Sequence, residues 1–174
     1  MEGPGIISTL AQGKDGRLAV LAATDATHPE IHAFDGKSLR PLTHQNDALM
    51  AELKLGSTEE FSCKAKDGTE VHGLIVKPPD YEPGRKYPTL LRIHGGPNGQ
   101  DSHAFSFERQ IFAANGYVVV AVNYRGSSGR GEKYQTAIAA DWGNKEVVDL
   151  QAAMDHVVTI GLADPDRLGV GGWS

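Results

Sequence analysis

Two glycine-rich segments contain the residue types that acyl-transfer chemistry requires. The first is Gly172-Trp-Ser174, which follows a short apolar run at residues 167–171. A serine placed after a strand, with glycine two positions before it, matches the start of the nucleophile elbow G-x-S-x-G. In that motif a sharp turn presents the serine hydroxyl above a parallel sheet and leaves no room for side chains beside it. Ser174 is therefore the candidate nucleophile.

The second segment, His94-Gly95-Gly96-Pro97, follows the largely apolar run of residues 87–94. Attack of serine on a carbonyl makes a tetrahedral oxyanion, which needs N–H donors placed about 3 Å away. Gly95 and Gly96 can bring bare backbone close to such an oxygen, so they are the candidate oxyanion hole. Taken without Ser174, the same glycines indicate only a tight turn.

Strands and helices alternate from residue 60 onward. Strands 61–65 and 71–76 form a hairpin with Asp-Gly at its turn, and further strands are expected at 87–94, 117–122 and 167–173. Helices are expected at 106–115 and 145–160, and a turn at 164–166. Parallel strands need such crossovers, so the pattern predicts a doubly wound α/β sheet. In that architecture reactive groups gather beyond the carboxyl ends of the strands, where both glycine-rich segments lie.

Specific side chains support the two helices. The first helix ends with Gly116 as C-cap, and the second begins with Asn144 as N-cap. The residues expected on their apolar sides are Phe107, Ile111, Phe112 and Ala114 in the first, and Val147, Leu150, Met154 and Val157 in the second.

The first 55 residues have a different character. Short strands at 17–23, 30–34 and 39–42 are separated by turn formers at 14–16, 27–29 and 35–37. This meander predicts one blade of a β-propeller, or alternatively the N-terminal hairpin of an unrelated domain. We therefore expect two domains, residues 1–55 as part of a propeller and residues 56–174 as part of a catalytic domain.

Composition excludes several classes of protein. A net charge of −5 argues against a nucleic-acid binder, and no apolar run is long enough to span a membrane. No cofactor is predicted, and no metal, because the single Cys63 has no ligand spacing to a partner. Cys63 is expected to be a bystander thiol on a strand, and the default location is the cytoplasm.

The remaining motifs indicate structure rather than chemistry. The loop at 124–131 has its glycines in the wrong order for a dinucleotide loop, and its Arg125 is expected to pair locally or to line the cleft. Trp142 is expected to pack this loop against the following helix. Glu146 and Asp149 suit the positive N-terminal end of that helix, and His156 is expected on its solvated side.

The chain resembles the prolyl-oligopeptidase family of serine peptidases, in particular its acylaminoacyl-peptidase and dipeptidyl-peptidase-like members. The resemblance rests on the segments 92–97, 122–131, 141–143 with Glu146 and Asp149, and 164–174. It implies an α/β-hydrolase catalytic domain covered by a propeller, with short peptides as substrates, Ser174 as nucleophile, and Gly95 and Gly96 in the oxyanion hole. His94 would orient the oxyanion loop or touch the oxyanion itself. A homo-oligomeric full-length protein stays open.

The resemblance also implies a triad Asp and His after the serine, and nothing follows Ser174 in this sequence. None of the histidines lies in the expected place: His28, His32, His44, His72, His94, His103 and His156. The chain alone is therefore expected to be an inactive, truncated fragment, and to aggregate because strand 167–173 lacks a neighbour. An α/β-hydrolase carboxylesterase is the alternative to the peptidase, since it would share both glycine-rich segments.

Overall fold

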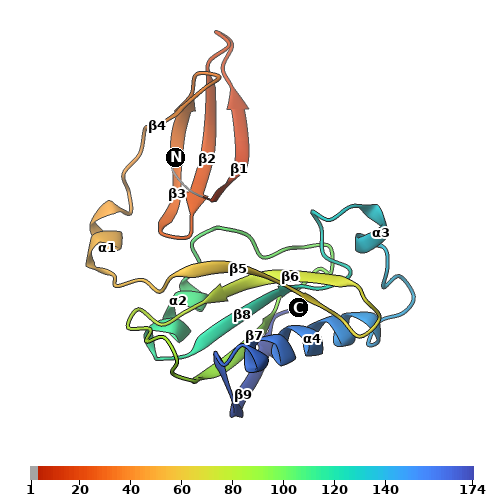
Figure 1. Cartoon of the computed structure of the whole chain (residues 1–174). Helices are drawn as coiled ribbons and strands as arrows, with labels where there is room; N and C mark the ends of the chain where they lie inside the picture. Colours follow the sequence, from red (N-terminus) through yellow and green to blue (C-terminus); the bar gives the residue numbers. More distant parts are fainter. Residues whose placement is uncertain (1–3) are drawn as a thin grey trace. The chain divides into compact units, whose positions relative to one another are not determined.

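The computed structural model describes residues 4–174, which divide into two units (Figure 1). The first contains the chain up to Leu55 together with Ser102–Phe107, and the second contains Gly56–Asp101 and Glu108–Ser174. Residues 1–3 of the predicted first domain lie outside the described residues. No helix in the described part of the chain is long and apolar enough to cross a membrane.

The first unit is built on an antiparallel sheet with the strand order β1-β2-β3-β4. Its elements are β1 (Gly5–Gln12), β2 (Leu18–Thr24), β3 (Thr27–Phe34), β4 (Leu39–Pro41) and α1 (Asp47–Glu52). The predicted meander is confirmed, but residues 27–29 begin β3 instead of forming a turn. Strand β1 and helix α1 were not predicted. Residues 102–107 join this unit, where His103 Nδ1 lies 2.5 Å from Asp25 Oδ2.

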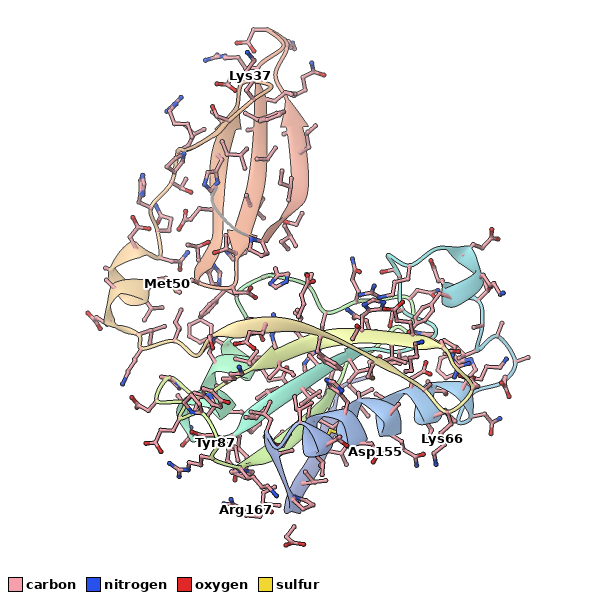
Figure 2. The ribbon with its side chains drawn as sticks, in the orientation of Figure 1. Lys37, Met50, Lys66, Tyr87, Asp155 and Arg167 are labelled. Carbon is pink, nitrogen blue, oxygen red and sulfur yellow. The ribbon has the colours of Figure 1, made fainter. Side chains whose placement is uncertain are left out.

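The second unit contains a five-stranded sheet with the order β5-β6-β8-β7-β9. Its strands are β5 (Thr58–Lys64), β6 (Glu70–Val76), β7 (Tyr87–Ile93), β8 (Val118–Asn123) and β9 (Ala163–Gly172). The first three strands of that order pair antiparallel, whereas β8, β7 and β9 pair parallel. Figure 2 labels Tyr87 at the start of β7 and Arg167 on β9. The predicted α/β sheet is confirmed.

Strand β8 is buried along its whole length, as its β-branched run predicts. Val118, Val120 and Val122 join the core cluster that contains Leu150 and Val157 of α4 (Lys145–Thr159). Val119 instead packs with Ala113 of α2 (Phe107–Ala114), in a separate cluster. Successive side chains of a strand point to opposite faces. Helices α4 and α2 therefore cover opposite faces of the sheet (Figure 1).

The apolar side predicted for the first helix is wrong. Phe107, Ile111 and Phe112 are exposed, and α2 buries Arg109, Gln110 and Ala113 instead. Gln110 satisfies the buried backbone of Gly56 in both directions, accepting from its N–H at 2.8 Å and donating to its carbonyl at 3.1 Å. A buried amide with both groups paired replaces the apolar contact.

The second helix also differs in detail from its prediction. Asn144 stands at the N-cap position, but its side chain donates to Asp141 Oδ1 at 2.7 Å and caps nothing. Val147 is exposed, while the buried side of α4 contains Asp149 and Ala153 beside the predicted Leu150 and Val157. Residues 164–166 continue β9 instead of forming a separate turn.

Asp67, at the turn between β5 and β6, makes stability depend on pH. Its carboxylate accepts from Thr69 N–H at 3.0 Å and from Arg125 at 2.6 Å, and these bonds lower its pKa to about 2. The folded-state pKa is below the unfolded value of about 3.9, so this stabilisation is present above pH 4 and is lost as pH falls through about 2. The side chain is 47% exposed, so we expect less than about 1 kcal/mol. Denaturant unfolding of wild type and Asp67→Asn should differ at pH 5 and converge near pH 2; equal stability at both would contradict this.

Candidate active site

Ser174 lies two residues after the end of β9, and its backbone adopts the left-handed conformation with φ 79°. Few residues other than glycine adopt a positive φ, because the Cβ atom crowds the backbone there. A serine in this conformation after a parallel strand has the local geometry of a nucleophile elbow. The Ser174 side chain is exposed and lines a cavity.

The two glycine-rich segments predicted from the sequence meet in the structure. Strands β7 and β9 pair parallel, with Ile93 opposite Gly172. The segments that follow these two strands therefore leave the sheet at the same edge. A Cβ atom added to Gly95 would lie 2.7 Å from Ser174 Cβ and 2.7 Å from the Trp173 carbonyl oxygen. The backbone of Gly95 therefore lies against Ser174 with no space for a side chain.

The conformation of the next residue also requires glycine. Gly96 has φ 137°, a region that side chains rarely adopt, and a Cβ atom there would lie 2.6 Å from two backbone nitrogens. The sequence His94-Gly-Gly-Pro97 thus folds tightly, and its bare backbone reaches the serine.

A cavity of about 280 Å³ lies beside Ser174 and is lined by His94, Gly95, Trp142 and Glu146 among others. Trp142 is 67% exposed at this cavity, so the prediction that it packs the 124–131 loop onto the helix is wrong. Glu146 accepts from Gly143 N–H through Oε1, while its buried Oε2 has no hydrogen-bond partner among the described residues. Burial, together with the charges of Glu146 and Asp101, raises the pKa of Tyr124, which keeps that hydroxyl a neutral donor.

His94 is buried beneath the glycine turn and both of its ring nitrogens are occupied. Nδ1 lies 2.9 Å from the Gly95 carbonyl oxygen, and Nε2 lies 2.9 Å from Ser127 Oγ. The ring stacks on Tyr124 at 4.6 Å, and the Tyr124 hydroxyl donates to the His94 carbonyl at 2.6 Å. These contacts favour loop support over direct contact with an oxyanion.

Arg125, in the loop after β8, and Asp149, on α4, form a buried ion pair. Arg125 Nη2 lies 2.8 Å from Asp149 Oδ1, and the backbone N–H of Arg125 donates to Asp149 Oδ2 at 2.7 Å. Asp149 was predicted to suit the positive end of the helix; in the structure its contacts with Arg125 hold the loop that follows β8. Burial lowers the pKa of Arg125, yet the hydrogen bonds that it donates to Asp149 and Asp67 outweigh burial and raise the pKa above the ordinary value.

No histidine forms a hydrogen bond with Ser174 in the part of the chain that the structure describes. His156, predicted to be solvated, is half-buried and stacks on Phe61 at 5.7 Å. His72 lies 3.8 Å from Glu70, and His44 bonds Asp47. Residues 4–174 contain no group of side chains suited to a metal ion. Cys63 is a free, half-buried thiol on β5, and burial raises its pKa.

Gly95→Ala should disable the site while leaving the sheet intact. The new Cβ atom cannot fit 2.7 Å from Ser174 Cβ, so the serine or the turn must move. A misplacement of about 1 Å costs roughly 10²-fold in rate, and we expect a loss of that size in serine-directed labelling of the full-length protein. Gly171→Ala is the matched control, because nothing lies within 4 Å of its added Cβ. Equal labelling rates for the two variants would show that Gly95 is not in the site.

Comparison with known proteins connects this geometry to a family. Residues 103–174 match the family model described as "Prolyl oligopeptidase family". The chain is 33% identical to "Uncharacterized peptidase YuxL" of Bacillus subtilis, covering 97% of this chain and 26% of that protein. It is also 33% identical to "Dipeptidyl-peptidase 5" of Porphyromonas gingivalis, covering 98% of this chain and 27% of that protein. The chain thus spans about a quarter of the length of these relatives.

Solved structures of peptidases share the fold of this chain. An acylaminoacyl peptidase of Pyrococcus horikoshii superposes with a TM-score of 0.88 at 29% identity, covering 100% of this chain and 28% of that one. A puromycin-hydrolyzing peptidase of Mycobacterium tuberculosis superposes with a TM-score of 0.82 at 28% identity, covering 95% and 26%. The fold is therefore that of an α/β-hydrolase domain preceded by propeller-type strands, as predicted. With these similarities over nearly its whole length, the chain belongs to the prolyl oligopeptidase family.

Proposed function

We propose that the full-length protein is a serine peptidase that forms an acyl-enzyme on Ser174. The observation that carries the proposal is the contact between Gly95 and Ser174, which places bare backbone beside an exposed serine hydroxyl. Serine acyl transfer needs this combination of an accessible nucleophile and nearby N–H donors. Membership of a peptidase family supports the same chemistry.

In this mechanism Ser174 Oγ attacks the carbonyl carbon of the scissile amide, and the carbonyl π-electrons move to its oxygen. Backbone N–H groups around Gly95 and Gly96 stabilise the oxyanion, and His94 holds the turn from behind. Collapse expels the protonated amine and leaves an ester on Ser174, which water hydrolyses to the acid and the free serine. By family resemblance, the histidine that carries the proton and its partner aspartate come later in the full-length protein.

The substrates we propose are short peptides, cleaved as dipeptides, acylated residues or internal fragments. Relatives named as dipeptidyl and acylaminoacyl peptidases support this class. The antiparallel sheet β1–β4 also favours the peptidase over a carboxylesterase, because a propeller blade has this form and hydrolase esterases do not need one.

Hydrolysis of a substrate panel by the full-length protein tests this function. The panel contains dipeptidyl and acetyl-aminoacyl anilides, simple acyl p-nitrophenyl esters, and intact casein. We expect turnover of at least one peptide anilide and little digestion of casein. Turnover of esters alone would favour the carboxylesterase, and efficient digestion of casein would contradict selection for short peptides.

A further inference from the structure

Ser127, in the loop after β8, contacts the oxyanion turn through His94. Its side chain is fully buried, and its hydroxyl lies 2.9 Å from His94 Nε2. Further bonds join the same two regions: Ser128 N–H donates to the Gly99 carbonyl at 2.9 Å, and the side chain of Asn123, the last residue of β8, pairs in both directions with the backbone of Asp101. The end of β8 and the loop after it therefore hold the loop after β7 in place through hydrogen bonds.

The directions of the hydrogen bonds at His94 follow from their chemistry. The Gly95 carbonyl can only accept, so Nδ1 of His94 must carry the hydrogen of the neutral ring. Nε2 is then an acceptor, and it is the Ser127 hydroxyl that donates to it. Both ends of the imidazole are fixed, one by a carbonyl of the turn and the other by Ser127.

This arrangement determines where the next N–H points. The bond between Gly95 and Gly96 is trans, so the Gly95 carbonyl and the Gly96 N–H point in opposite directions. The carbonyl is held towards His94 and Gly99, since a Cβ atom on Gly99 would lie 2.9 Å from its oxygen. The Gly96 N–H is thus directed away from His94, and Gly96 lines the cavity beside Ser174.

We propose that Ser127 is a positioning residue: through His94 it fixes the 95–96 peptide plane and so directs the Gly96 N–H at the oxyanion. This inference rests on the proposed function of Ser174. Ser127 touches no reacting atom. Its hydroxyl holds the imidazole, the imidazole holds the Gly95 carbonyl, and the peptide bond transmits that orientation to the donor.

Ser127→Ala tests the proposal in the full-length protein with a peptide anilide. Loss of an entire oxyanion donor costs about 10²–10³ in kcat, so a misdirected donor should lower kcat by roughly ten- to a hundredfold. KM should stay within about twofold, because the donor acts mainly on the transition state. Ser128→Ala is the matched control, since among the described residues the Ser128 hydroxyl forms no hydrogen bond with His94, and alanine keeps the backbone N–H that bonds Gly99. Ser127→Cys keeps the buried space filled with a weak donor and should show the same direction of change if the alanine variant unfolds.

A double-mutant cycle separates positioning from a general effect on stability. His94→Phe keeps a ring against Tyr124 but cannot bond Ser127 or Gly95. In that background Ser127→Ala should cause no further loss of kcat, because the two residues act in series. Additive losses, or an unchanged kcat in Ser127→Ala alone, would overturn the proposal.

The proton position on His94 provides a readout that needs no catalysis. Long-range ¹H–¹⁵N correlation spectra should show the hydrogen on Nδ1 and a bare Nε2. A hydrogen on Nε2 of the neutral ring would refute the inferred chain of bonds, even in an active enzyme. If the wild-type protein hydrolyses nothing, the proposed function fails, and this spectrum still decides whether His94 orients the turn as we infer.

Discussion

Ser174→Ala is expected to lower kcat of the full-length protein by roughly six orders of magnitude, the loss seen when a serine hydrolase loses its nucleophile. The positive φ of Ser174 and the contact with Gly95 give this hydroxyl the geometry of an elbow nucleophile. Without Oγ no acyl-enzyme can form, and only binding and the oxyanion donors remain to assist attack by water.

Steady-state hydrolysis of a peptide anilide measures this change, and melting temperature controls for folding. Removing one hydroxyl oxygen changes little packing volume, so the alanine variant should melt within a few degrees of wild type. Ser128→Ala again serves as the control and should keep full activity. A Ser174→Ala variant that retained more than about 1% of kcat would place the nucleophile elsewhere, given the roughly 10⁶-fold loss expected.

Asp149→Ala is expected to destabilise the protein by about 3–5 kcal/mol, the cost of breaking a buried ion pair by removing one partner. Asp149 is fully buried and Arg125 nearly so, and the substitution leaves the guanidinium without its main counter-charge. It also removes the acceptor of the Arg125 backbone N–H. Net folding stability is only about 5–15 kcal/mol, so a loss of this size can unfold a large fraction of the protein.

Denaturant unfolding of the full-length protein measures this effect. The Asp149→Ala variant should unfold at a lower denaturant concentration in the transition that includes the second unit. Asp67→Asn is the matched control: Asp67 also bonds Arg125, at 2.6 Å, but its side chain is 47% exposed. That variant should lose less than about 1 kcal/mol at neutral pH. A comparable loss in both variants would show that burial does not distinguish the two carboxylates.

The sequence predicted those secondary-structure elements that depend mainly on neighbouring residues in the chain. The run of valines in β8 and the hairpin around Gly68 are examples, because β-branched side chains and an Asp-Gly turn have few alternatives. Ser174 and Gly95 were predicted as a pair because parallel strands end at one edge of a sheet. The structure brings them together there.

The predictions that were wrong or incomplete concern residues whose surroundings are set by contacts with distant parts of the chain. The apolar residues of α2 could not show which side of the helix the sheet would cover, and Gln110 is buried because it pairs with Gly56, 54 positions away. Asp149 was assigned to the charged start of the helix, because the neighbouring residues in the sequence do not indicate that Arg125 is its ion-pair partner. Ser127 lies in a glycine- and serine-rich loop, where a buried hydroxyl cannot be told from a solvated one by sequence.

A crystal structure of the full-length protein with a covalent phosphonate tests the central claim most directly. The phosphonate mimics the tetrahedral intermediate, and its phosphoryl oxygen marks the position of the oxyanion. We predict a bond from phosphorus to Ser174 Oγ and a phosphoryl oxygen 2.7–3.1 Å from a backbone nitrogen of the Gly95–Gly96 turn. An adduct on another residue, or a phosphoryl oxygen directed away from that turn, would contradict the account.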